Sequence, residues 1–236
     1  MKHYPRPDPG DQPPFLYPPY SATILRAPRK PLIQFPHTPS ELTGPLYGHN
    51  PIGETDHDLT CQHPGEPLGE RIVVAGRVMD EDGRAIPHTL IELWQCNAAG
   101  RYHHNIDDHR APLDPNFSGA GRTITDENGK YRFVTIKPGA YPWRNHANAW
   151  RPAHIHFSLF GPCFITRLIT QMYFEGDPLI WRCPIVNAIP DKAAIEQLIA
   201  LLDMNNSIPM DACAYKFDIV LRGCRSTLFD SRKEGN

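Results

Sequence analysis

Proline most strongly limits what this 236-residue chain can fold into, because its ring fixes φ and removes a backbone donor. The chain has 26 prolines, and twelve of them lie in the first 45 residues. Such density excludes long helices and central strands there and favours turns or polyproline-like backbone. Residues 1–70 are therefore predicted to form a long irregular N-terminal arm. Its apolar side chains would be unusual in a solvated linker, so the arm is expected to pack on the core and on a partner chain: Ile24, Leu25, Leu32, Ile33 and Phe35.

Residues 71–236 alternate between short apolar segments and turn sequences. Arg71–Met79 is rich in β-branched residues and ends in a turn, after which Thr89–Trp94 is expected to return beside it as a hairpin. The turn sequence Thr125–Gly129 predicts a second hairpin. Further strands are expected at His154–Phe160, Phe164–Phe174 and Tyr215–Leu221.

One segment has the period of a helix. In Asp191–Met204 the apolar residues repeat every 3.6 positions, and Asp191 stands where an N-cap would. Many short strands and a few short helices predict a mainly β fold, a β-sandwich or barrel-like core of mixed sheets. We expect residues 71–236 to form this domain.

Charge and composition exclude several classes of function. The formal net charge is −2, so no basic excess is available to bind a phosphate backbone, and nucleic acid is disfavoured as a partner. No apolar run approaches the roughly 18 residues of a membrane span, and the N-terminus does not resemble a signal peptide. The six cysteines form no Cys-x-x-Cys pair, which favours free buried thiols over disulfides or a thiolate metal site. A cytoplasmic location is expected.

The strongest chemical signal is a pair of histidines at an interval of two. His154 and His156 lie on a predicted strand, so both imidazoles leave the same face, about 6.6 Å apart at Cα. Two imidazoles with carboxylate or water would suit zinc or ferrous iron, whereas two satisfied or exposed histidines remain the alternative. Tyr141, beside Pro142, and Tyr102, which follows a glycine-containing segment, add phenols. Phenolate is a hard anionic ligand that suits ferric iron.

Several motifs together resemble those of the intradiol ring-cleavage dioxygenases, most closely the β subunits of their hetero-oligomeric members. The segments that carry the resemblance are Val74–Val78, Ile91–Gln95, Gly100–Tyr102, Pro138–Asn145, Trp150–Phe157, Thr170–Pro178 and Asp203–Asn206. The likeness extends from about Pro18 to Leu228. It implies ring cleavage of 3,4-dihydroxybenzoate with O2 to 3-carboxy-cis,cis-muconate, in aromatic-compound catabolism through the β-ketoadipate pathway.

The resemblance also implies a metal, a partner and residue roles. One non-haem Fe(III) per chain would be held by Tyr102, Tyr141, His154 and His156. Tyr141 would also accept a substrate proton, and Arg151 would stabilise negative charge on the substrate. The family pairs this chain with an α subunit, which would supply the cation facing the substrate carboxylate. The remaining pocket residues would be Tyr20, Trp143, Gln171 and Ile185.

Other interpretations remain open at this point. A catechol or hydroxyquinol 1,2-dioxygenase shares the ferric chemistry, although such enzymes carry a helical N-terminal region that the proline-rich arm cannot form. A transthyretin-like β-sandwich could bind ligands without catalysis. A zinc hydrolase could use the His154/His156 pair. Trp143 and Ile185 could belong to the core, and Arg151 could pair with a carboxylate for structural reasons.

Overall fold

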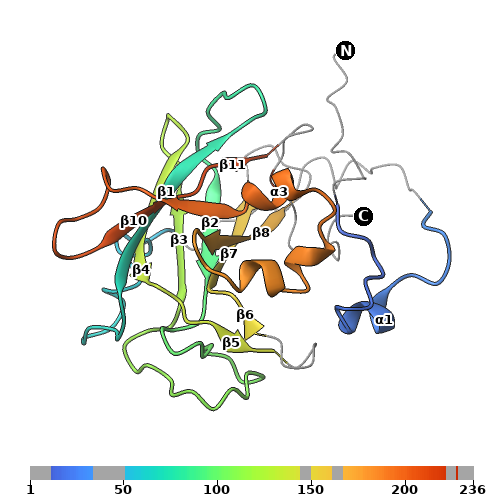
Figure 1. The fold of residues 1–236 in the computed structure, drawn as a ribbon. Coiled ribbons are helices and arrows are strands. Elements are labelled where there is room, and N and C mark those ends of the chain that lie inside the picture. Colours follow the sequence, from blue (N-terminus) through green and yellow to red (C-terminus); the bar gives the residue numbers. More distant parts are fainter. Residues whose placement is uncertain (1–11, 34–50, 144–149, 161–166, 222–226, 228–236) are drawn as a thin grey trace.

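The computed structural model describes residues 12–33, 51–143, 150–160, 167–221 and 227 (Figure 1). Its strands are β1 (Arg71–Met79), β2 (Leu90–Trp94), β3 (Ala120–Ile124), β4 (Lys130–Ile136), β5 (Tyr141–Pro142), β6 (Trp150–Arg151), β7 (His154–Phe160), β8 (Leu168–Phe174), β9 (Ile199–Leu202), β10 (Cys213–Lys216) and β11 (Ile219–Val220). Its helices are α1 (Ala22–Arg26), η2 (Ile180–Arg182), η3 (Val186–Ala188) and α3 (Lys192–Glu196). The expected mainly β fold with few short helices is confirmed.

Nine strands form one mixed sheet that curls into a nearly closed, barrel-like shape (Figure 1). Their order is β11-β1-β10-β9-β8-β7-β2-β3, and β4 pairs with the other edge of β1. β1 is parallel to β10 and β11, and β8 is parallel to β9, while the remaining neighbours are antiparallel. β5 and β6 form a separate two-stranded sheet.

The main core fills the space that the curled sheet encloses. Ile155, Phe157 and Leu159 point inward from β7 and are fully buried, as expected for the face opposite the two histidines. Phe157 contacts Phe133 of β4, with ring centres 6.3 Å apart, and Phe217, at 5.3 Å. Strands far apart in the sheet order therefore meet across one hydrophobic core.

Residues 56–62 close the gap between the edge strands β3 and β4. The Leu59 amide donates to the Val134 carbonyl oxygen on β4 at 2.9 Å, and the Arg122 amide on β3 donates to the Asp56 carbonyl oxygen at 3.0 Å. The Leu59 side chain is fully buried in the main core. This part of the expected arm thus contributes to the core of the domain.

A second hydrophobic cluster covers the outer face of β8. Tyr173 belongs to this cluster, which otherwise comes from the segment that carries η2, η3 and α3. This segment packs against the outer face of β8 through Tyr173. The buried members are Tyr173, Ile180, Cys183, Val186, Ile189, Ala194, Ile195 and Leu198.

The strand pairing differs from both predicted hairpins. β2 does not return beside β1 but pairs with β3 and β7, because both edges of β1 are occupied by β4 and by β10 with β11. The Thr125–Gly129 turn joins β3 to β4, which pair with β2 and β1 respectively and not with each other. Turn sequences predict where the chain reverses, but here each reversal carries it to a different part of the sheet.

The predicted helix over Asp191–Met204 is wrong in its second half. Asp191 does cap α3, accepting a hydrogen bond from the Ala193 amide at 2.9 Å. The helix ends at Glu196, and Ile199–Leu202 forms β9, which lies between β8 and β10. Pairing with β8 and β10 provides hydrogen-bond partners for the backbone N–H and C=O groups of this apolar run. The side chains of Leu201 and Leu202 are exposed, whereas the predicted helix would have buried them.

The structure contains strands at all three of the other expected positions. β7 matches the expected strand His154–Phe160, and β8 covers 168–174 of the expected Phe164–Phe174, with 164–166 outside the described residues. The expected strand Tyr215–Leu221 divides into β10 and β11.

The arm contains the helix α1, where Leu25 is 89% exposed and Ile24 is also exposed. Leu32 and Ile33, which follow the helix, are exposed as well. Phe35 lies outside the described residues.

Among the described residues, no helix has the length and apolar character needed to cross a membrane. The four described cysteines are free thiols, as expected. Cys96 and Cys183 are buried, Cys213 is partly buried and Cys61 is exposed, so the prediction that they are buried holds only in part. Cys163 and Cys224 lie outside the described residues.

Candidate metal centre

β7 presents His154 and His156 on the face that points away from the main core. Their ring centres are 5.0 Å apart, and His154 is fully buried. His154 Nδ1 lies 2.7 Å from the Pro152 carbonyl oxygen. Because a carbonyl can only accept, Nδ1 carries the proton and Nε2 keeps its lone pair for another partner.

Tyr102 reaches this pair from the loop that follows β2. Asn97 shapes the start of that loop, since its Oδ1 accepts hydrogen bonds from the Ala99 and Arg101 amides at 3.0 and 2.9 Å. Asp107 accepts a hydrogen bond from the Tyr102 amide at 2.7 Å. The Tyr102 hydroxyl then lies 3.4 Å from Nε2 of His154 and 3.2 Å from Nε2 of His156.

Tyr141 reaches the same cluster from β5. Its hydroxyl lies 3.4 Å from Nε2 of His154, and its ring centre is 5.6 Å from that of Tyr102. The two tyrosine loops touch through glycine: a Cβ on Gly100 would lie 2.6 Å from the Ala140 carbonyl oxygen. The structure therefore brings all four predicted metal ligands to one point.

Burial controls the protonation of this cluster. Burial raises the pKa of Tyr102 well above its usual value, and the nearby Tyr141 phenol raises it further. Burial likewise raises the pKa of Tyr141, although the Arg151 charge opposes this shift. Burial holds the pKa of His154 well below its usual value, helped by the charge of Arg151. Without a metal cation, the phenols and His154 are therefore neutral at physiological pH, and a phenolate here requires more positive charge than Arg151 provides.

Arg151 lies beside the cluster and is held by two polar side chains. It is buried on β6, opposite Tyr141 on β5. Its Nη2 donates to Gln171 Oε1 and lies 3.4 Å from the Tyr173 hydroxyl, which itself donates to Gln171 Oε1 at 2.8 Å. The structure thus joins Arg151 to Gln171, which sequence reasoning had assigned to the substrate pocket.

The other predicted pocket residues lie at different distances from the cluster. Trp143 lies under the Arg151 guanidinium, 5.6 Å from its central carbon, and Tyr20 contacts Trp143 edge to face at 4.9 Å between ring centres. Ile185 packs against the second hydrophobic cluster, to which Tyr173 also belongs.

Sequence reasoning missed two residues next to the site. Trp94 lies directly opposite His156 in the β2–β7 pairing, and its indole stacks on the imidazole at 4.8 Å with an angle of 2° between the planes. Tyr173 follows Gln171 by two positions on β8, so both leave the same face. The two-residue period could have indicated Tyr173, but Trp94 required the strand register.

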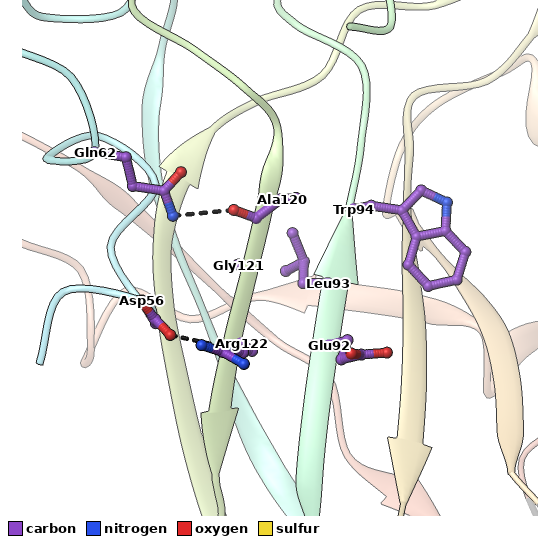
Figure 2. A pocket seen from close by; sticks show the side chains of 8 residues that line it. All are labelled: Asp56, Gln62, Glu92, Leu93, Trp94, Ala120, Gly121 and Arg122. Atoms are coloured by element: carbon purple, nitrogen blue, oxygen red, sulfur yellow. Dashed lines mark hydrogen bonds and ion pairs between the residues drawn. The ribbon is translucent and has the colours of Figure 1, made fainter. Parts of the chain in front are cut away.

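The described residues hold no zinc-type cluster, and a cavity lies apart from the four predicted ligands. Within the described residues, no group of three or more His, Cys, Asp or Glu side chains gathers at one point, so the His154/His156 pair lacks a third ligand of the kinds that zinc usually takes. A cavity of about 330 Å³ contains none of the four predicted ligands, and the indole of Trp94 at its border points away toward β7 (Figure 2). It is lined by Asp56, Gln62, Glu92, Leu93, Trp94, Ala120, Gly121 and Arg122.

Two imidazoles on the outer face of β7 thus meet one phenol from the loop after β2 and one from β5. The chain belongs to the intradiol ring-cleavage dioxygenase family, whose profile, described as Dioxygenase, matches residues 42–223. A second profile, the N-terminal region of the protocatechuate 3,4-dioxygenase β subunit, matches residues 4–38.

Sequence comparison with individual relatives assigns the chain to the same family. The chain is 54% identical over 217 residues to the protocatechuate 3,4-dioxygenase β chain of Burkholderia cepacia, covering 91% of this chain and 92% of that one. It is 31% identical to the α chain of the Pseudomonas putida enzyme, over 84% of this chain and 98% of that one. The catechol 1,2-dioxygenase structure from Pseudomonas arvilla C-1 has the same fold, with a TM-score of 0.55 and 24% identity over 78% of this chain and 62% of that one.

Proposed function

We propose that this chain is the iron-binding β subunit of a protocatechuate 3,4-dioxygenase. It cleaves the ring of 3,4-dihydroxybenzoate between its two hydroxyl-bearing carbons, with O2, to give 3-carboxy-cis,cis-muconate. One observation carries the proposal: two phenols and two imidazoles meet at one point in a chain that is 54% identical to such a β chain over 91% of its length.

The four side chains fit a single ferric ion. Ligand bonds of about 2.0–2.1 Å place neighbouring ligand atoms about 2.9–3.5 Å apart. The three measured separations between phenol oxygens and imidazole nitrogens, 3.2 to 3.4 Å, lie within this range. Two phenolates nearly neutralise Fe(III), and the cation in turn makes the buried phenolates favourable. Tyr102, Tyr141, His154 and His156 would hold the ion, which supplies the Lewis acidity that draws electron density from a bound catecholate.

The surrounding residues bind and orient the substrate. We assign the Tyr141 phenolate oxygen the role of accepting a proton from a substrate hydroxyl, which converts Tyr141 to the neutral phenol. Gln171 and Tyr173 hold Arg151 in place. Its guanidinium would then lie where negative charge develops on a hydroxyl oxygen of the substrate ring. The aromatic wall of Trp143 and Tyr20 limits the approach of water and aligns the ring.

Two further proposals concern the partner and the location. We propose that the chain works in an assembly with an α subunit, because its relatives include α chains as well as β chains. The exposed apolar side chains of α1 would then meet that subunit. We also propose a cytoplasmic location, which suits the free thiols of the four described cysteines.

The test is oxygen uptake by the chain co-expressed with its α subunit. We expect a coloured protein with about one iron per β chain, and faster oxygen uptake with 3,4-dihydroxybenzoate than with catechol. The colour arises from charge transfer between tyrosinate and ferric iron. A colourless protein with stoichiometric zinc would overturn the proposal, and a preference for catechol would favour the 1,2-dioxygenase alternative.

A further inference from the structure

The peptide group between Pro152 and Ala153 is held by hydrogen bonds at both ends. Its carbonyl oxygen accepts from Nδ1 of His154, at a distance of 2.7 Å. Its N–H, which belongs to Ala153, donates to Oδ2 of Asp177 at 3.1 Å. One planar, conjugated amide therefore connects a carboxylate to an imidazole of the candidate metal centre.

The pairing of β7 with β8 explains why Asp177 reaches this peptide. The two strands are antiparallel and His154 lies opposite Tyr173, so the start of β7 lies beside the end of β8. The chain turns directly after β8. This turn brings Asp177 back to Ala153 at the entry to β7.

The two oxygens of the Asp177 carboxylate have different partners. Oδ1 accepts a hydrogen bond from the Leu179 amide at 2.9 Å, which stabilises the local turn before η2. Oδ2 makes the long-range bond to Ala153. Among the described residues, no Lys, Arg or His forms an ion pair with this carboxylate. The local turn explains the bond at Oδ1 and leaves the bond at Oδ2 without a role in η2.

The bonds along this path strengthen one another. A carboxylate that accepts from an amide N–H shifts electron density toward the carbonyl oxygen of the same amide, which becomes a better acceptor. A stronger acceptor at Nδ1–H makes Nε2 of the same imidazole a better metal ligand and fixes the ring orientation. His154 is fully buried, and a low local dielectric increases such effects.

We propose that Asp177 is a positioning residue for His154 and acts on it through the Pro152–Ala153 peptide. Asp177 holds the entry to β7, keeps the proton of His154 on Nδ1 and strengthens Nε2 as a ligand. This inference rests on the proposed function, because it assigns His154 to a bound iron.

The experiment compares Asp177→Asn and Asp177→Ser with Asp191→Asn in the assembled α–β enzyme. Serine can accept from the Leu179 amide in a local turn, but it has no carboxylate for Ala153. Asp191 is the matched control, since its Oδ1 also accepts from an amide two positions on, that of Ala193 at 2.9 Å. The Asp191 bond is local and lies in the same covering segment.

Two quantities are measured: the affinity for Fe(III), by competition with a chelator, and the Fe(III)/Fe(II) reduction potential. Both Asp177 variants should bind Fe(III) about tenfold more weakly, as expected when a group that orients a metal-bound histidine is lost. A tenfold loss confined to the ferric form corresponds to a potential higher by about 59 mV. Asp191→Asn should change neither quantity, although it should lower Tm as the Asp177 variants do.

The outcomes separate this inference from the proposed function. An unchanged reduction potential in both Asp177 variants, or an equal rise in Asp191→Asn, overturns the inference and leaves Asp177 with its local turn alone. If the unsubstituted assembly takes up no iron, the proposed function itself fails. Asp177→Ser keeps the test decisive if Asp177→Asn does not fold, and far-UV circular dichroism checks the fold of each variant.

Discussion

At the scale of single residues, burial and a cation must act together on Tyr102 and Tyr141. Burial raises the pKa of both phenols, so neither is anionic by itself at neutral pH. A bound ferric ion would reverse this preference, because the attraction of a trivalent cation would exceed the cost of desolvating a phenolate. The metal and the two ionised phenols should therefore appear and disappear together.

The first prediction concerns Tyr102→Phe. Losing this ligand should remove part of the visible charge-transfer band and lower the iron content of the purified protein. Absorption spectra and iron analysis measure both effects. Tyr215→Phe, which removes a phenol outside the site, is the control and should leave the band unchanged. An unaltered band in Tyr102→Phe would exclude this residue from the ligand set.

The second prediction concerns Trp94, whose indole stacks on His156. Trp94→Leu should release iron to a chelator about 2- to 10-fold faster, because an aromatic pair contributes about 0.5–1.5 kcal/mol beyond its buried area. Trp94→Phe keeps an aromatic ring against His156, so its rate of iron release should stay close to that of the unsubstituted protein. Trp181→Leu, at an exposed tryptophan of η2, is the matched control. Equal release rates in Trp94→Leu and the control would contradict the role of the stack.

At the scale of elements, the site depends on two loops that meet backbone to backbone. Gly100 has a φ of +78°, and a Cβ there would lie 2.6 Å from the Ala140 carbonyl oxygen and 3.0 Å from the Tyr141 Cβ. Glycine is thus required twice, for its backbone conformation and for the close approach of the loop that carries Tyr141. The contact between these two loops, rather than the sheet, sets how far apart the phenols of Tyr102 and Tyr141 lie.

The third prediction compares Gly100→Ala with Gly83→Ala. Both glycines have a φ of +78°, but a Cβ on Gly83 would meet nothing within 4 Å. Gly83→Ala should cost only the conformational strain, about 1–2 kcal/mol. Gly100→Ala should cost more and should also shift the charge-transfer band, since Tyr141 must move. Thermal unfolding and visible spectra measure the two effects; equal stability losses with an unshifted band would argue against the loop contact.

At the scale of the whole molecule, a nearly closed sheet leaves a seam between β3 and β4 that a non-strand segment covers. Leu59 fills the core at this seam, and the Asp56 carboxylate accepts a hydrogen bond from Arg122 on β3 at 2.6 Å. The inner face of the sheet is filled by the main hydrophobic core. His154 and His156 leave the outer face of β7, where the hydroxyls of Tyr102 and Tyr141 approach them.

The fourth prediction is a pH dependence of this seam. The hydrogen bond from Arg122 lowers the pKa of Asp56, although burial opposes the shift. A lowered folded-state pKa adds stability above the unfolded value of about 3.9, and this stability is lost as the pH falls through the folded value. Arg122→Gln should therefore lower Tm by about 1–3 °C at pH 7, and by less at pH 3.

The control for this prediction is Arg132→Gln, an exposed arginine on β4. Its Tm should match that of the unsubstituted protein at both pH values. A Tm difference for Arg122→Gln that is as large at pH 3 as at pH 7 would show that the ion pair is not its cause.

Local patterns allowed much of the site to be predicted. The interval of two between His154 and His156 placed both rings on one face of β7, because side chains alternate along any strand. The Asp191 cap could also be predicted, since capping depends on residues two or three positions apart. The strand at Ile199–Leu202 could not be predicted, because a short apolar run suits either a helix or a strand until its neighbours are known.

The sequence by itself therefore indicated the candidate site residues and determined that the side chains of His154 and His156 leave the same face of their strand. The tertiary structure alone decided that β2 lies beside β7, which places Trp94 on His156, and that the loops of Tyr102 and Tyr141 meet at Gly100. The physical reason is one of range. Side-chain direction follows from backbone geometry within a few residues, whereas strand pairing follows from burial and hydrogen bonding across the whole chain.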